Sequence, residues 1–183
     1  MKLEMEKWQS GKDVVRAITL DDAADFYEIV KQPPLYAALW WQAESVEACA
    51  RQIQVVHLSY RQKQLPQTMV IERNEQMIGL LHVSRMEDDL IEIGYFLHPA
   101  YWRQGIMKRV LAEWLKRLSR QFSLHRIEAY CACDNTASIA LLKSCGFHYE
   151  GRLREVCKDQ NGAYQDMLLY ALIVSDRVKE EIG

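Results

Sequence analysis

The chain has 183 residues, with 23 Lys and Arg against 25 Asp and Glu, and a formal net charge of −2. This length is enough for one substantial core, so we expect a single domain over residues 1–183. The near-neutral charge excludes bulk attraction to nucleic acid or to an anionic membrane. No apolar run approaches the roughly 18 residues of a membrane span. We therefore expect a cytoplasmic protein in which local groups bind any anionic ligand.

The five cysteines are an odd number in a chain too large to need disulfides. Reduced thiols in a cytoplasmic protein are the simplest interpretation. Cys131 and Cys133 are spaced so that both could bind one metal ion. Any two alternate residues of a strand lie on the same face, however, so this spacing alone does not indicate a metal site. No second cysteine or histidine pair stands at ligand spacing. We therefore expect no metal site.

The first third of the chain predicts one strand and two helices. "VVRAIT" reads as a strand, and "TLDDAADFYEIVK" follows as a helix with Thr19 as N-cap and Asp22 at the third helical position. Pro33 and Pro34 end that helix. In "SVEACARQIQVVHLSYRQ" the apolar residues recur at steps of 3 and 4, which indicates a helix with one buried face.

The middle of the chain predicts an antiparallel meander followed by a longer helix. The strands are "QTMVIER", "QMIGLLHVS" and "LIEIGYFLHP", separated by short polar connections. After Gly105 the apolar residues have helical spacing over about four turns. They are Ile106, Val110, Leu111, Trp114, Leu115 and Leu118.

The last third predicts a strand, a helix and a hairpin. "HRIEAYCA" is a strand, and "DNTASIALLKSCGF" is a helix that ends at Gly146. Two more strands flank the polar turn "DQNG". The expected order is therefore β-α-α-β-β-β-α-β-α-β-β.

The segment "HPAYWRQGIMKRVL", residues 98–111, lies where a strand turns into a helix. The first backbone N–H groups of a helix lack intrahelical partners and attract an anion. Gly105 allows close approach, and Arg103, Lys108 and Arg109 add positive charge. A phosphate-bearing cofactor is one interpretation. A glycine-containing turn with solvated cations is the alternative.

Three stretches resemble one protein family: "EIGYFLHPAYWRQGIMKRVL", "DNTASIALLKSCGF" and "EGRLREV...GAYQDMLLYALI". Together they resemble the GCN5-related N-acetyltransferases, and within them the ribosomal-protein-alanine acetyltransferase-like (RimJ/RimL) group, over roughly residues 14–174. The family pattern has Gln or Arg, two residues, Gly, one residue, then Gly or Ala. Trp102 stands at the first position, Gly105 matches, and Met107 replaces the small residue, where a longer side chain could crowd the phosphates.

The resemblance implies an α/β (α+β) fold with a mixed central sheet of about seven strands and four helices, splayed between the fourth and fifth strands. It also implies acetyl-CoA as co-substrate, held by its pyrophosphate and pantetheine. The cofactor-binding positions implied are Phe96, Leu97, His98, Arg103, Gln104, Gly105, Ile106, Met107, Lys108, Asn135, Ser138 and Lys143.

The family reaction that this resemblance implies is direct attack of an amine on the acetyl thioester. A backbone N–H near Leu97 would donate to the oxyanion. The family motif Asn-x-x-Ser is met by Asn135 and Ser138, which implies that Asn135 binds pantetheine and Ser138 donates to the departing sulfur. Helix capping is the alternative role for both residues.

Two carboxylates are candidates for the general base. Glu92 shares a strand face with Gly94 and Phe96, close to the expected thioester position. The close relatives instead use a glutamate on the strand after "GF", where Glu155 is the nearest carboxylate in a segment that is one residue longer. Pairing with a surface cation is the alternative for each glutamate.

Acceptor specificity is expected to come from the first two helices and the last strands. The candidate contacts are Tyr36, Trp40, Trp41, Tyr164 and Asp166. Packing of the aromatic residues onto the sheet is the alternative, and Asp166 would suit a cationic acceptor.

The resemblance favours a protein N-terminal α-amine as the acceptor. A small amine such as a polyamine or an aminoglycoside is the alternative acceptor. A non-catalytic acyl-CoA-binding regulator is the alternative function. The oligomeric state is open, with a homodimer as one alternative. A Rossmann dehydrogenase is disfavoured, because no Gly-x-Gly-x-x-Gly loop follows the first strand.

Overall fold

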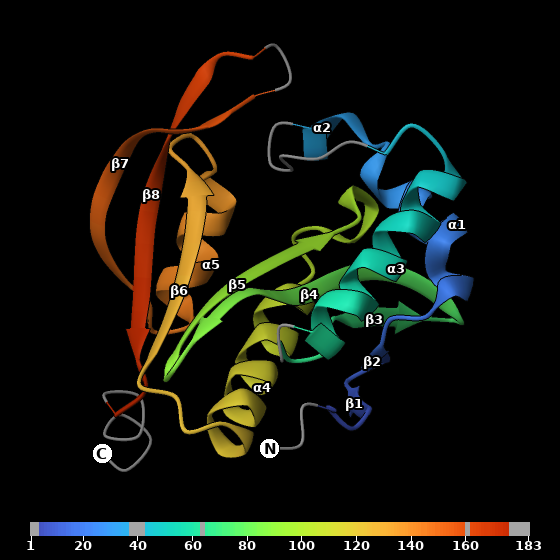
Figure 1. Cartoon of the computed structure of the whole chain (residues 1–183), viewed down its shortest axis with the longest axis horizontal. Coiled ribbons are helices and arrows are strands. Elements are labelled where there is room, and N and C mark those ends of the chain that lie inside the picture. Colours follow the sequence, from blue (N-terminus) through green and yellow to red (C-terminus); the bar gives the residue numbers. More distant parts are fainter. Residues whose placement is uncertain (1–3, 37–42, 63–64, 160–161, 176–183) are drawn as a thin grey trace.

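The computed structural model describes residues 4–36, 43–62, 65–159 and 162–175 (Figure 1). Its strands are β1 (Trp8–Ser10), β2 (Asp13–Ala17), β3 (Met69–Arg73), β4 (Gln76–Glu87), β5 (Leu90–Leu97), β6 (Arg126–Ala132), β7 (His148–Lys158) and β8 (Tyr164–Ile173). Its α-helices are α1 (Ala23–Val30), α2 (Pro33–Tyr36), α3 (Val46–Gln62), α4 (Ile106–Gln121) and α5 (Thr136–Ser144). Short 3₁₀ turns precede α1 (Leu20–Asp22) and follow β5 (Pro99–Tyr101).

The eight strands form one mixed sheet in the order β1-β2-β3-β4-β5-β6-β8-β7. The expected mixed sheet is confirmed, and β3, β4 and β5 form the expected antiparallel meander. Two elements were missed, the strand β1 and the single-turn helix α2. Each is too short to show a hydrophobic period, and β1 exists through its pairing with β2 around Gly11, which has a φ of 58°.

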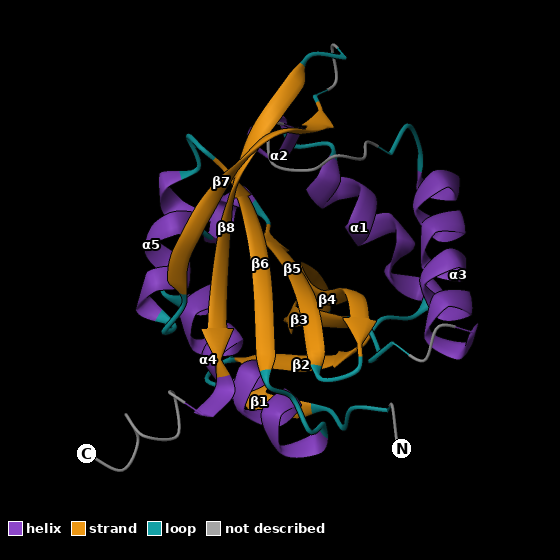
Figure 2. Ribbon diagram, turned by 60° about the vertical axis from the view of Figure 1, so that its left-hand side comes forward, coloured by secondary structure: helices purple, strands orange, loops and turns teal. Residues whose placement is uncertain are grey.

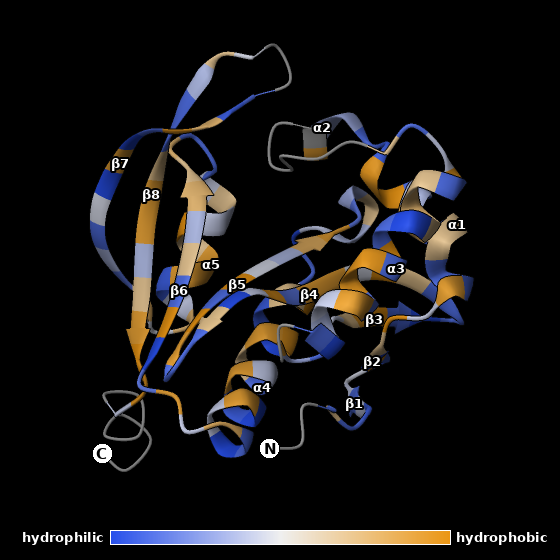
Figure 3. Ribbon diagram, in the orientation of Figure 1, coloured by the Kyte–Doolittle hydropathy of each residue, from blue (hydrophilic) through white to orange (hydrophobic). Residues whose placement is uncertain are grey.

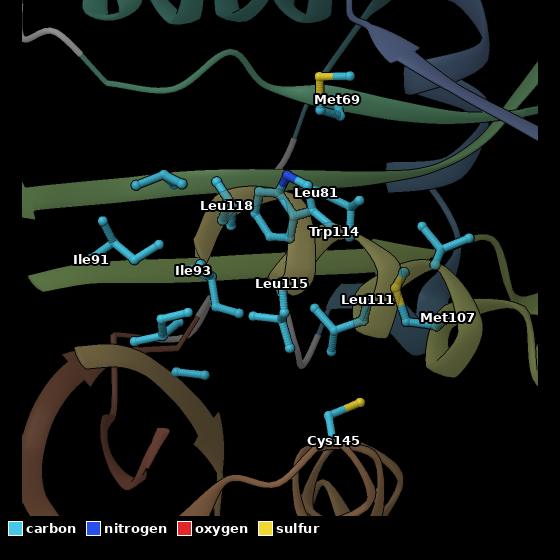
Figure 4. Packing of buried hydrophobic residues seen from close by; sticks show 14 of the residues in the cluster. Met69, Leu81, Ile91, Ile93, Met107, Leu111, Trp114, Leu115, Leu118 and Cys145 are labelled. Carbon is cyan, nitrogen blue, oxygen red and sulfur yellow. The ribbon is translucent and has the colours of Figure 1, made fainter. Parts of the chain in front are cut away.

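Helices cover both faces of the sheet. On one face α4 buries the apolar side chains predicted from its spacing, and Trp114, Leu115 and Leu118 are fully enclosed. They pack against Ile91 and Ile93 of β5 (Figure 4). The helices α1 and α3 cover the other face through a second apolar cluster (Figure 2).

The edge strand β7 differs in polarity from its neighbour β8. Figure 3 shows β7 as mainly hydrophilic and β8 as mainly apolar. This difference fits their positions, since β8 lies between β6 and β7 whereas β7 ends the sheet.

All five cysteines are free, as expected. Within the described residues, no helix combines the length and the apolar content needed to cross a membrane.

Candidate active site

The candidate site lies where β5 and β6 separate. The two strands pair in parallel up to Ile93 and Ala129, and the described pairing ends there although β5 continues to Leu97. Figures 1 and 2 both show the two strands diverging beyond that point. The divergence falls between the fourth and fifth of the strands expected from the sequence, as predicted. It leaves backbone groups of β5 facing away from the rest of the meander.

Leu97 presents such backbone groups. It lies opposite Gly79 on β4, and the next residue, His98, donates its N–H to Ile78 O at 2.8 Å. In an antiparallel ladder this register makes Leu97 a non-hydrogen-bonded position, so its N–H and C=O point away from β4, toward the side of β6. The carbonyl accepts a hydrogen bond from Trp102 Nε1 at 2.7 Å. The N–H is the group predicted as oxyanion donor.

The loop between β5 and α4 has the backbone shape of an anion site. Gly105 is the N-cap of α4 with a φ of 70°, and Arg103 also has a positive φ of 60°. A Cβ on Gly105 would meet no described atom within 4 Å. The loop is exposed at the positive end of a 16-residue helix, which favours a bound phosphate.

The two residues directly after Gly105 can reach this site only through their backbone. Ile106 and Met107 bury their side chains in the core beneath α4, and Figure 4 shows Met107 there. The possibility that the Met107 side chain crowds the phosphates is therefore wrong. The helix turns that side chain inward, where it packs with the apolar face.

The cations around the loop differ in their availability. Lys108 and Arg103 are exposed, and Gln104 donates its side-chain N–H to Ala100 O at 3.1 Å. Arg109 is instead held by Asp13, with 2.6 Å between Nη2 and Oδ2. Its guanidinium is therefore engaged by a buried carboxylate, which it shares with Arg73.

Asn135 and Ser138 lie together at the start of α5. Asn135 is the N-cap, and its Oδ1 accepts the Ser138 N–H at 3.0 Å. The capping alternative is therefore confirmed for Asn135. The Ser138 hydroxyl lies 2.8 Å from Tyr95 Oη on β5, in a contact that joins β5 to α5.

Tyr95 is a site residue that the sequence analysis missed. Burial raises the pKa of its phenol, so the hydroxyl stays protonated at neutral pH. The residue follows Gly94 in the strand already assigned to the thioester, and this adjacency was the available signal. Its link to Ser138 joins segments 43 residues apart and could be seen only in three dimensions.

Glu92 is engaged with neighbours on β4. Its carboxylate accepts the Ser84 hydroxyl at 2.8 Å and lies 3.6 Å from Arg85 Nε. Arg85 also pairs with Glu128 of β6 at 2.8 Å. The predicted alternative, pairing with a cation, is confirmed, and a role as general base stays a prediction.

The predicted acceptor wall near β7 and β8 is internally paired. Glu155 is exposed at a φ of 53°, in a bulge where β7 takes four steps from Leu153 while β8 takes two from Met167. Its N–H donates to Asp166, and Arg152 lies 2.7 Å from the same carboxylate. Together they hold the pKa of Asp166 below its usual range. Asp166 is therefore already paired within the hairpin, and its contact with a cationic acceptor stays a prediction.

The other predicted contacts are dispersed. Tyr164 is 60% exposed near the hairpin tip, where Lys158 Nζ lies 4.9 Å from its ring centroid. Lys143 is exposed in the last turn of α5. Trp40, Trp41 and the Tyr36 side chain lie outside the described residues. Within the described ranges, no group of three or more His, Cys, Asp or Glu could hold a metal ion.

Comparison with known proteins defines the class first. A family model described as an acetyltransferase (GNAT) domain matches residues 14–148. A solved structure of RimL, the ribosomal L7/L12 alpha-N-protein acetyltransferase in complex with coenzyme A, has the same fold. It aligns with a TM-score of 0.84 and 24% identity over 92% of this chain and 98% of that one. The family model and the fold are therefore those of an acetyltransferase.

Sequence relatives narrow this class to a family. An uncharacterized N-acetyltransferase, YoaA of Bacillus subtilis (strain 168), is 31% identical over 71% of this chain and 75% of its own length. The ribosomal-protein-serine acetyltransferase of Escherichia coli (strain K12) is 27% identical over 75% of this chain and 78% of its own length. The chain belongs to the GNAT family of N-acetyltransferases and uses acetyl-CoA as its co-substrate.

Proposed function

We propose that this enzyme acetylates the α-amino group of a protein N-terminus. The observation that carries the proposal is the 27% identity with a ribosomal-protein-serine acetyltransferase over 140 residues. Chemistry supports the same acceptor. An α-amine has a pKa of about 8 against about 10.4 for lysine, so its neutral fraction near pH 7 is about two hundred times larger. A site with few free carboxylates therefore suits it.

In the proposed reaction, backbone and hydroxyl groups surround the thioester. The Leu97 N–H donates to the carbonyl oxygen while the amine nitrogen bonds to the acetyl carbon. The carbon–sulfur bond then breaks, and the Ser138 hydroxyl donates a hydrogen bond to the departing thiolate. The backbone N–H groups in the first turn of α4, which have no intrahelical partners, hold the pyrophosphate. Glu92 and Glu155 stay the two carboxylates that the sequence predicts as candidate bases.

The acceptor is tested with a panel of amines. Peptides with a free N-terminus, the same peptides with a blocked N-terminus and an internal lysine, spermidine and an aminoglycoside are each incubated with acetyl-CoA. Thiol release gives the rate, and mass spectrometry locates the acetyl group. We expect kcat/KM for the free α-amine to exceed that for every other amine by at least about tenfold. A preference for spermidine or the aminoglycoside would refute the proposal.

Removing the Ser138 hydroxyl is expected to slow the chemical step. We expect Ser138→Ala to lower kcat roughly tenfold to a hundredfold, since a hydrogen bond to a charged group contributes about 1.5–3 kcal/mol. The Kd for acetyl-CoA should stay within about twofold, because the lost bond forms mainly with the leaving thiolate. Single-turnover kinetics and calorimetry measure the two quantities.

The same helix offers a matched control for this substitution. Ser144 is exposed at the end of α5, and its hydroxyl donates to Leu141 O at 2.8 Å. Ser144→Ala also removes a hydroxyl oxygen, but one that lies away from the point where β5 and β6 separate. This variant should leave kcat unchanged. Equal rates for the two variants under chemistry-limited conditions would exclude Ser138 as the sulfur donor.

A further inference from the structure

His82 lies directly over a glycine of the neighbouring strand. It belongs to β4 and is paired with Gly94 of β5. A Cβ on Gly94 would lie 2.2 Å from His82 Cε1, 2.8 Å from Nε2 and 3.0 Å from Nδ1. The imidazole therefore turns the edge that carries both nitrogens toward the β5 backbone. Only a glycine at position 94 leaves room for this arrangement.

This contact lies where β5 and β6 begin to separate. Gly94 follows Ile93, the last residue of β5 that pairs with β6. Because side chains alternate along a strand, His82 shares its face with Leu80 and Phe96, which belong to the cluster beneath α1 and α3. The imidazole therefore lies where the two strands begin to separate, on the face of the sheet that α1 and α3 cover.

The Ser138 hydroxyl reaches the opposite face. Its partner Tyr95 is adjacent to Gly94 in the strand and packs against the cluster beneath α4. The His82 imidazole and the Ser138 hydroxyl thus lie on opposite faces of the sheet, near the point where β5 and β6 separate. Such an arrangement suits a reaction in which one group receives a proton from the nucleophile and another donates to the leaving group.

The ring nitrogens of His82 are free to take a ligand. Nδ1 is buried without a hydrogen-bond partner, and Nε2 has none either among the described residues. The charged groups on the same face are engaged elsewhere, since Glu92 binds Ser84 and Arg85 binds Glu128. Burial lowers the pKa of His82 to about 4, so the ring is neutral at pH 7. A neutral imidazole carries one nitrogen lone pair that can accept a proton.

We propose that His82 is the residue that accepts the proton of the acceptor amine during acetyl transfer. The amine nitrogen bonds to the acetyl carbon and becomes an ammonium in the tetrahedral adduct, where it is far more acidic than in the free amine. Its proton passes to the free nitrogen of His82, forming imidazolium. The carbon–sulfur bond then breaks, coenzyme A leaves as thiolate, and solvent takes one proton from His82 and returns one to the thiolate. The proposal rests on N-acetyl transfer and not on which amine is used.

Kinetics of His82→Gln test the proton-accepting role. Glutamine can still form hydrogen bonds but cannot take up a proton, so kcat/KM for the acceptor should fall about a hundredfold or more. The Kd for acetyl-CoA should stay within about twofold of wild type. His148→Gln, at an exposed histidine of β7, is the matched control and should retain full activity. A kcat/KM for His82→Gln within about threefold of wild type would overturn the proposal.

Two further variants separate a chemical role from a structural one. Gly94→Ala keeps the imidazole but displaces it, because the new Cβ would overlap Cε1. We expect this variant to lose activity and the double variant with His82→Gln to lose no more than His82→Gln alone. Added imidazole should restore part of the rate of His82→Ala. Additive losses together with no rescue would show a purely structural role.

A labelling experiment without an acceptor amine tests whether His82 lies beside the acetyl group of bound acetyl-CoA. Diethyl pyrocarbonate modifies unprotonated imidazole nitrogens, and mass spectrometry locates the modified residues. Saturating acetyl-CoA should slow labelling of His82 at least about fivefold, since a base within reach of the attacking nitrogen lies beside the acetyl group. The exposed His125 and His148 should label equally with and without acetyl-CoA.

The labelling outcomes are separable from those of the amine panel. An unlabelled His82 in the free enzyme, or labelling unaffected by acetyl-CoA, would refute the role of His82. Turnover of small amines only would refute the protein N-terminus as acceptor and leave the result for His82 intact.

Discussion

Acetyl-CoA is expected to bind the Gly105→Val variant at least about tenfold more weakly than the wild-type enzyme, a loss of about 1.4 kcal/mol. Gly105 has a φ of 70°, a conformation that a β-branched residue adopts only with strain. Its missing Cβ faces open space at the N-terminus of α4, where the proposed pyrophosphate site lies. Valine would therefore both shift the loop and occupy the approach to the backbone N–H groups.

A second glycine separates these two effects. Gly162, in the turn between β7 and β8, has a φ of 80° and likewise has no described atom within 4 Å of a built Cβ. Gly162→Val should carry a similar backbone strain without contact with the cofactor. Calorimetric titration with acetyl-CoA measures Kd, and thermal unfolding measures strain. Equal Kd values for the two variants would place the pyrophosphate elsewhere.

The Asp13→Ala variant is expected to lose about 3 kcal/mol of unfolding free energy. Asp13 is fully buried on β2, with Arg73 Nε of β3 at 2.6 Å and Arg109 Nη2 of α4 at 2.6 Å. Removing the carboxylate leaves two guanidinium groups at the sheet without their shared partner. The strands β2 and β3 and the helix α4 then lose the one side chain that joins them through these ion pairs.

An exposed ion pair provides the comparison for Asp13. Glu28 of α1 pairs with Lys31 at 2.6 Å, and the Glu28 side chain is 58% exposed. Glu28→Ala should change the unfolding free energy by no more than about 0.5 kcal/mol, as surface pairs contribute little. Urea unfolding at constant m-value gives both energies. A loss for Asp13→Ala as small as that for Glu28→Ala would show that solvent screens the cluster.

The correct expectations came from patterns that are local in the chain. The burial of Trp114 and Leu118 follows from helical spacing, and the end of α5 follows from Gly146, whose φ is 88°. The turn at Gly105 also depends only on neighbouring residues. Such features survive any rearrangement of distant segments, which is why the amino-acid order alone predicts them.

The features that the sequence analysis did not predict concern partners that are distant in the chain. Arg109 stands 96 residues from Asp13, so their ion pair could not be predicted from the residues around Arg109. Met107 turns into the core because α4 lies on the sheet, and Asp166 is compensated by a strand that bulges beside it. The hydrophobic period fixes which face of a helix is apolar but not which charged groups meet.

The amino-acid order is enough to predict a mixed α/β fold, a strand-to-helix turn suited to a phosphate, and resemblance to acetyl-CoA-dependent N-acetyltransferases. How the proton-handling groups meet depends on the folded chain. It placed the Ser138 hydroxyl against Tyr95 and the His82 ring over Gly94. These contacts depend on strand register and on the docking of α5, which are long-range packing interactions that local spacing does not specify.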